Sequence, residues 1–168
     1  MTIPVWTTVA EMRSALAPVR AGGERIVLVP TMGDLHEGHL SLVRAARREC
    51  DKVVVSIFVN PTQFGENEDL DKYPQDLEGD LAKAAEAGAE LAYTPTRDTV
   101  YPPGYQTRVT VPELAAPLCG ASRPGHFDGV LTVVAKLFNL VRPDVAVFGR
   151  KDAQQCLVIA EMVRDLDM

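Results

Sequence analysis

The stretch Pro30-Thr31-Met32-Gly33-Asp34-Leu35-His36-Glu37-Gly38-His39 joins a short apolar run to an amphipathic segment. The run, from Arg25 to Val29, predicts a buried strand. The segment from about Gly38 to Glu49 predicts a helix, because its apolar positions have helical spacing. His36 and His39 then share one face at the start of that helix. Backbone N–H groups and the helix dipole at such a start favour an anion. The stretch therefore predicts a phosphate site directly after a strand.

Two other interpretations of the histidine pair stay open: two surface histidines at a helix terminus, or a pair of zinc ligands. The spacing differs from HExxH, and no cysteine or third ligand stands at metal-site spacing nearby. The sequence has no GxxxxGK(S/T) pattern and no GxGxxG after the first strand. What remains is a histidine-based nucleotide site, in which imidazole donates hydrogen bonds to phosphate oxygens. Gly38, without a Cβ, lets a bulky group approach the first helical turn.

Strands and helices alternate along the rest of the chain. Beyond the two elements above, the expected strands are Val53–Val59, Glu90–Tyr93, Gln106–Val111 and Asp144–Phe148, and the expected helices are Thr8 to Gly22, Asp76–Ala87, Asp128–Val141 and Asp152–Asp165. This alternation predicts an α/β fold with a doubly wound, Rossmann-like parallel sheet. Such sheets bind ligands beyond the carboxyl ends of their strands. That rule selects residues 30–39, 60–73 and 149–152.

Bulk composition indicates one globular domain with a net charge of −6, which gives no general attraction for nucleic acid or for an anionic membrane. No apolar run is long enough to span a bilayer, and the N-terminus has no signal-peptide pattern. Three well-separated cysteines, Cys50, Cys119 and Cys156, form no disulfide framework. A soluble cytoplasmic protein is expected. The chain stops at Met168, after a helix that should lead into another strand, so we expect one domain cut from a longer chain.

Five blocks of the sequence resemble the pantothenate synthetase (pantoate–β-alanine ligase, AMP-forming) family, within the HxGH nucleotidyltransferase superfamily. They occur in the family's order and spacing and extend over most of the chain. The blocks are PTMGDLHEGH (Pro30–His39), VSIFVNPTQF (Val55–Phe64), YP (Tyr73-Pro74), RPGHFDGVLTVV (Arg123–Val134) and FGRKDAQQ (Phe148–Gln155).

The resemblance implies that residues 30–39 hold ATP, with His39 as proton donor or transition-state stabiliser and His36 as its partner on the phosphates. The second ATP-binding segment would be Gly149-Arg150-Lys151-Asp152. In that segment Lys151 would act on phosphate, and Asp152 on the ribose or adenosine side. From the residues alone, Lys151 and Asp152 could equally be a solvated pair in which Asp152 caps the last helix.

The resemblance also implies a site for pantoate and β-alanine. Gln63 and Gln155 would bind pantoate, because amides can both donate to and accept from hydroxyl groups. The same site would be completed by Asn60 and Phe58, which shape the pocket, and by Arg123 and His126, which approach the substrates. Other interpretations stay open for three of these: Gln155 as the capping-box partner of Asp152, Arg123 as a solvated loop charge, and His126 as a core histidine.

Two positions depart from the family pattern. Where the family carries an acidic pair associated with magnesium, this chain reads Gly79-Asp80, which leaves Asp80 as a candidate metal ligand or as an exposed helix carboxylate. Arg150 stands where the family has glutamate, and its side chain is expected to face away from the ligand.

The implied reaction joins pantoate to β-alanine through a pantoyl adenylate, with ATP and Mg²⁺ required and with AMP and pyrophosphate released. A homodimer is implied by the family alone. A C-terminal lid domain with a KMSKS-like element is absent from the sequence, so we expect weak or no turnover. The alternatives are another HxGH nucleotidyltransferase and a non-catalytic binding or dimerisation module.

Overall fold

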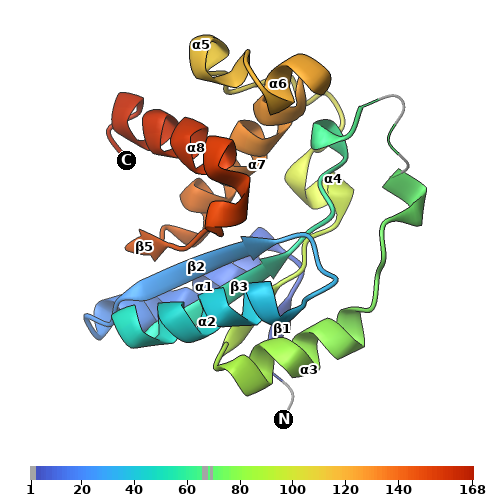
Figure 1. The fold of residues 1–168 in the computed structure, drawn as a ribbon. Helices are drawn as coiled ribbons and strands as arrows, with labels where there is room; N and C mark the ends of the chain where they lie inside the picture. The colour runs from blue at the N-terminus through green and yellow to red at the C-terminus, as the bar shows by residue number, and fades with distance from the viewer. Residues whose placement is uncertain (1–2, 66–67, 69) are drawn as a thin grey trace.

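The computed structural model describes residues 3–65, 68 and 70–168, and its centre is a parallel sheet (Figure 1). The sheet has five strands in the order β1-β4-β3-β2-β5. The strands are β1 Val5–Trp6, β2 Ile26–Thr31, β3 Lys52–Ile57, β4 Leu91–Tyr93 and β5 Val145–Ala146. The longest ladder joins β2 to β3, from Ile26 opposite Lys52 to Thr31 opposite Ile57. All the pairings between neighbouring strands of this sheet are parallel, so the predicted α/β fold is confirmed.

Helices cover both faces of this sheet. The long ones are α1 Val9–Ala21, α2 Glu37–Glu49, α3 Leu77–Ala87, α7 His126–Val141 and α8 Ala153–Asp165. The short ones are α4 Arg97–Val100, α5 Pro112–Ala115, α6 Cys119–Ser122 and the 3₁₀ turns η1 Pro61–Gln63, η2 Leu70–Lys72 and η3 Arg150–Asp152. Among the residues described, no helix combines the length and the apolar character that a membrane crossing requires.

Alternating side chains of the central strands feed two separate cores. Val27 and Val29 of β2 pack with apolar residues of α2 and α3, including Val43 and Ala84. Ile26 and Leu28 point to the opposite face, into a larger core built with α1, α7 and α8. Figure 1 shows the same division, with α2 and α3 on one side of the sheet and α7 and α8 on the other. A strand buried on both faces explains why residues 26–29 are apolar without alternation.

The chain reverses its winding direction at β2. From β2 it passes through α2 to β3, whereas β5 and the α8 helix that follows lie on the other side of β2. In open α/β sheets this switch point is where ligands bind, outside the carboxyl ends of the strands. The fold therefore directs the search to the ends of β2, β3 and β5.

One expected strand is wrong. Residues 106–111 pair with no strand in the described part of the chain, although Val109 and Val111 pack against the larger core. The backbone N–H of Val109 donates instead to the Thr132 hydroxyl of α7, over 3.0 Å. Conversely, β1 was not expected, because two residues are too few to show an alternating pattern. Its backbone nevertheless lies in the sheet, and Trp6 accepts a bond from the N–H of Thr94.

Candidate active site

A cavity of about 170 Å³ lies at the carboxyl ends of β2 and β3. It brings together side chains from five segments, many of them expected from the sequence. The expected residues in its wall are Pro30, Thr31, Met32, His39, Phe58, Asn60, Gln63, Asp152 and Gln155. The wall also contains residues that sequence reasoning did not single out for the site: Tyr73, Phe148 and, from α7, Val130, Val133, Val134 and Leu137. The α7 residues were missed because an apolar stripe on a buried helix predicts core packing.

The histidine pair at the start of α2 is held in one orientation by the backbone. The N–H of Gly38 donates to Nδ1 of His36 over 3.1 Å, and the N–H of His36 donates to Nδ1 of His39 over 3.4 Å. The two ring centroids are 4.3 Å apart. Because each Nδ1 accepts a bond, the proton of each neutral ring resides on Nε2. Both rings therefore carry an Nε2–H donor.

His39 is half-buried, whereas His36 is exposed. Burial lowers the pKa of His39 below its ordinary value and the nearby His36 lowers it further, against the smaller opposing effect of the Asp80 and Asp34 carboxylates. A neutral His39 at pH 7 follows. Lys151 itself is exposed in the η3 turn, and its charge contributes to the lowering of the His39 pKa.

The β2–α2 loop, residues 32–36, is fixed from α3. Asp80 is buried, with 1% of its surface exposed, so its interpretation as an exposed helix carboxylate is wrong. Its two carboxylate oxygens accept the N–H groups of Asp34, over 2.8 Å, and Leu35, over 2.7 Å. Nζ of Lys83 donates to the carbonyl oxygen of Leu35 over 2.9 Å. Side chains of helix α3 therefore hold this loop by binding the loop's backbone.

The remaining residues of the expected phosphate stretch lie around the cavity, outside its wall. Gly33 and Leu35 are buried, while Asp34 and Glu37 are exposed. Glu37 forms an ion pair with Arg44, one of the solvated pairs along α2. A Cβ added to Gly38 would lie 2.8 Å from Cε1 of His36, so glycine leaves room for the His36 ring.

The β3–α3 loop, residues 58–76, begins close to Asn60, which organises the turn that follows it. Asn60 is buried, and its Nδ2 donates to Oε1 of Gln63 and to the carbonyl oxygen of Gly129, each over 3.0 Å. Its Oδ1 accepts from Thr62 and from the Tyr101 hydroxyl. Asn60 thus positions the Gln63 amide at the cavity wall.

Arg123 and His126 lie behind the Gln63 turn, outside the cavity wall. Nδ1 of His126 faces the carbonyl oxygen of Gln63 at 2.9 Å, and Nε2 faces Arg123 at 3.1 Å. Arg123 makes two bonds to the Glu68 carboxylate, of 2.6 and 2.9 Å, so this loop charge is paired although its side chain stays partly exposed. Burial lowers the pKa of His126, and the bonds from Arg123 lower the pKa of Glu68 to about 2. This chain of contacts fixes the backbone at Gln63.

The segment Gly149 to Asp152 reaches the cavity at the start of α8. Asp152 and Gln155 both line the wall, whereas Arg150 and Lys151 are exposed outside it. Asp152 stands at the N-cap position of α8 but makes no side-chain capping bond to its first turn within the described structure, so the alternative of a side-chain cap is wrong. The capping-box interpretation of Gln155 fails with it. Both side chains are therefore available to a ligand.

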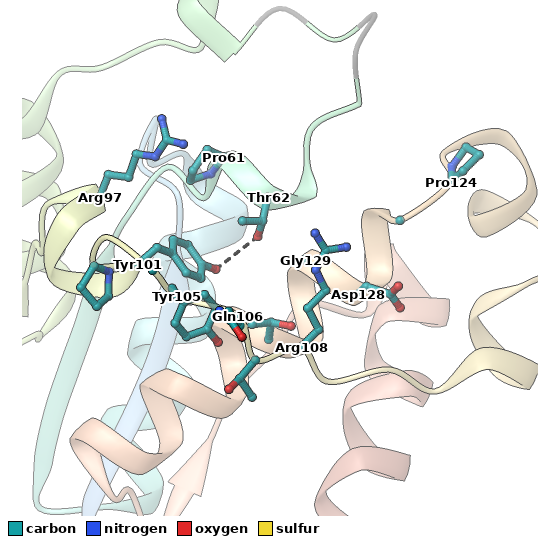
Figure 2. A pocket seen from close by; sticks show the side chains of 15 residues that line it. Pro61, Thr62, Arg97, Tyr101, Tyr105, Gln106, Arg108, Pro124, Asp128 and Gly129 are labelled. Atoms are coloured by element: carbon teal, nitrogen blue, oxygen red, sulfur yellow. Dashed lines mark hydrogen bonds between the residues drawn. The ribbon is translucent and has the colours of Figure 1, made fainter.

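A second, larger hollow of about 620 Å³ has Pro61 and Thr62 in its wall (Figure 2). Arg97 of α4 and Arg108 of the following loop belong to its wall. The Tyr101 hydroxyl points to Thr62 at 3.2 Å (Figure 2). None of the side chains predicted to act on substrates lines this hollow.

Zinc binding by the histidine pair has no structural support. Across the residues that the structure describes, no group of three or more His, Cys, Asp or Glu side chains could hold a metal ion.

Comparison with known proteins identifies the family. The model of the pantoate–beta-alanine ligase family matches residues 4–168. Pantothenate synthetase of Pseudomonas entomophila is 60% identical over 163 residues, which cover 96% of this chain and 57% of that protein. The enzyme of the same name from Pelotomaculum thermopropionicum is 56% identical, over 98% of this chain and 58% of that protein.

Solved structures agree. Pantothenate synthetase from Thermus thermophilus superposes with a TM-score of 0.93 at 54% identity, over 98% of this chain and 58% of that one. Pantoate–beta-alanine ligase from Francisella tularensis, solved with beta-gamma ATP and beta-alanine, has a TM-score of 0.90 at 39% identity, over 98% of this chain and 63% of that one. The chain thus spans somewhat more than half the length of these relatives, and it belongs to the pantoate–beta-alanine ligase family.

Proposed function

We propose that this chain carries the nucleotide and acid sites of an ATP-dependent ligase that joins pantoate to β-alanine. The supporting observation is the cavity between β2 and β3, where His39, Gln63, Asp152 and Gln155 converge. A histidine N–H donor for phosphate therefore stands beside two amides suited to a small hydroxy acid. The sheet places them at its switch point, where ligands of this fold bind.

In the proposed first step, a carboxylate oxygen of pantoate attacks the α-phosphorus of ATP. The bond to the β-phosphate oxygen breaks, and pyrophosphate leaves. His36 and His39 donate Nε2–H bonds to the phosphate oxygens as negative charge develops there. Lys151 adds a positive charge, and the remaining residues of 30–39 and of 149–152 surround the nucleotide.

In the proposed second step, the amine of β-alanine attacks the acyl carbon of pantoyl adenylate. AMP leaves with the electron pair of the acyl–oxygen bond, and the amine loses a proton. Gln63 and Gln155 hold the pantoyl group, and Asn60 and Phe58 shape its surroundings. Because Arg123 and His126 contact the Gln63 turn from behind, we assign them to positioning of that turn.

Magnesium belongs to the proposal as the counter-ion of the ATP phosphates. Asp80 does not fit as its ligand, because its carboxylate is buried and both of its oxygens already accept backbone N–H groups. We therefore assign the ion to phosphate oxygens and water, where Mg²⁺ commonly resides.

Two further properties rest on the family and on chemistry. We propose a homodimer, as the family resemblance implies. We also propose that the protein works in the cytoplasm, because it would consume ATP and because its three cysteines are free thiols.

The test is pantoate-dependent exchange of labelled pyrophosphate into ATP, with a full-length relative as positive control. We expect weak exchange that requires pantoate, little with other hydroxy acids, and a loss of about 100-fold in His39→Asn, as for removal of one transition-state donor. Binding of pantoate and ATP is measured alongside by calorimetry. A chain that binds neither is not this enzyme, and exchange that ignores the acid indicates another nucleotidyltransferase.

A further inference from the structure

Asp80 is the only buried acidic residue among those whose burial the structure describes. It lies in the first turn of α3, whose other acid, Glu78, is exposed. A buried carboxylate without partners would be costly, so its contacts explain why it is there. Those contacts all lead to the β2–α2 loop or to Lys83 of its own helix.

The bonds from Asp80 are directed at two consecutive peptide groups. Oδ2 accepts from Asp34 and Oδ1 from Leu35, at 2.8 and 2.7 Å. Bonds to an ionised acceptor are about twice as strong as neutral ones. Lys83 completes the grip, since its Nζ donates to the Leu35 carbonyl and lies 3.9 Å from Asp80 Oδ1. Helix α3 thus binds two backbone N–H donors and one backbone carbonyl acceptor of the same loop.

The loop needs these contacts because its backbone is strained. Gly33 has φ of 92° and Asp34 has φ of 52°, so two successive residues adopt the left-handed region. A non-glycine residue there is unfavourable and persists only when its surroundings fix it. A Cβ on Gly33 would lie 3.0 Å from Oδ2 of Asp80, which shows how closely the carboxylate follows the turn. Leu35 and then His36 follow these two residues directly in the sequence.

We infer that Asp80, assisted by Lys83, is a positioning residue for the phosphate site and acts on the nucleotide through His36 and His39. This inference rests on the proposed ATP site. It gives the family's acidic position a role that requires no metal contact in this chain. At Gly79, the Asp76 carboxylate occupies the space of a Cβ, 2.2 Å from where that atom would stand. An acidic pair would therefore require Asp76 to move.

The test compares Asp80→Asn with Glu78→Gln, which removes one charge from an exposed position of the same helical turn. Asparagine keeps one acceptor but replaces the other with an NH₂ donor, so one loop N–H loses its partner. We expect hydrogen exchange at the Asp34 and Leu35 amides to accelerate about ten-fold or more in Asp80→Asn, the ratio that corresponds to about 1.4 kcal/mol. Glu78→Gln should exchange as the wild type does.

ATP binding distinguishes a positioning role from a metal role. We expect Asp80→Asn to bind ATP roughly ten-fold more weakly both with Mg²⁺ and with EDTA. A loss confined to the Mg²⁺ titration, with unchanged exchange at residues 34 and 35, would overturn the inference. Lys83→Met, on a half-exposed side chain, tests the same grip if Asp80→Asn does not fold, and it should show both effects in smaller size. If the wild type binds no ATP, the proposed function fails, and amide exchange alone decides whether the grip exists.

Discussion

The β2–α2 loop and the β3–α3 loop leave the sheet at neighbouring strand ends, yet they are fixed by different means. The first is held by a buried carboxylate that binds backbone N–H groups directly. The second is held by side chains: Asn60 from within the loop, and His126 and the Glu68–Arg123 pair from the far side. Both arrangements deliver one functional group to the cavity, His39 or Gln63.

The difference lies in exposure. The Asp80 side chain is 2% exposed, whereas the Glu68 and Arg123 side chains are 32% and 37% exposed. Salt and water screen the second pair and hardly reach the first. The loop expected to hold a highly charged nucleotide is thus tied by contacts that ions do not disturb. The loop expected to hold a small acid is held in part by an ion pair that salt and water can weaken.

The largest effect is expected where α7 touches the β3–α3 loop. A Cβ at Gly129 would lie 2.4 Å from the Thr62 carbonyl oxygen and 2.6 Å from the Gln63 nitrogen, both backbone atoms. We expect Gly129→Ala to lower the free energy of unfolding by about 3 kcal/mol, because overpacking outweighs the helix propensity gained. Urea denaturation measures it. Gly149→Ala is the control, since the nearest atom there is 3.8 Å away. Equal stability of the two variants would contradict the close approach.

A smaller effect is expected at Asn60. Asn60→Asp keeps the acceptor for Thr62 and Tyr101 but loses the donor to Gln63 and Gly129. It then sets a carboxylate against two acceptor oxygens, and we expect a loss of about 2 kcal/mol by thermal or urea unfolding. The same change at Asn139, an exposed α7 residue that donates to Ala135, should cost less. If the two substitutions cost the same, Asn60 does not organise the loop.

The smallest effect is expected at the Glu68–Arg123 pair, and its pH dependence has a definite sign. Folding lowers the pKa of Glu68 from 4.5 to about 2. Its contribution is therefore complete above pH 4.5 and is lost as the pH falls through about 2. We expect Glu68→Gln to cost at most about 1 kcal/mol at pH 7, less in high salt, and almost nothing at about pH 2. The measurement is the unfolding difference from wild type across pH and salt.

The same unfolding series on Asp80→Asn sharpens the comparison between the loops. Its cost should change little with salt, because the carboxylate is buried. A strong salt dependence there would show that the two loops are held alike.

Local pattern predicted the main elements well. The apolar run at 25–29, the helix from about residue 38 and the strongly apolar segment before Arg142 all became elements close to the expected bounds. Local pattern did not predict short elements or elements that depend on distant residues. Strand β1 is defined by its pairing with β4, which lies far from it in the sequence. Segment 106–111 forms no strand, and the Val109 N–H donates to the Thr132 hydroxyl.

The candidate site divides in the same way. His39 could be selected because it begins a helix directly after a strand, and the strand-end rule selected the segments that contain Asn60, Gln63 and Asp152. The roles of these three residues, and the choice of Gln155, came from the family resemblance. The α7 wall could not be selected, since side chains that line a cavity have the same apolar pattern as those in the core. Tyr73 lies in a matched block and in a selected loop, but no role was assigned to it.

By itself, the sequence determined the parallel α/β architecture and the strand ends that carry chemistry, because hydrophobic periodicity and capping act over a few residues. Only the tertiary structure decided what holds those ends in place. Asp80 and Asp34 are 46 positions apart, and Glu68 and Arg123 are 55 apart. No local pattern records such pairs, since they exist only after the crossovers fold helices onto the sheet.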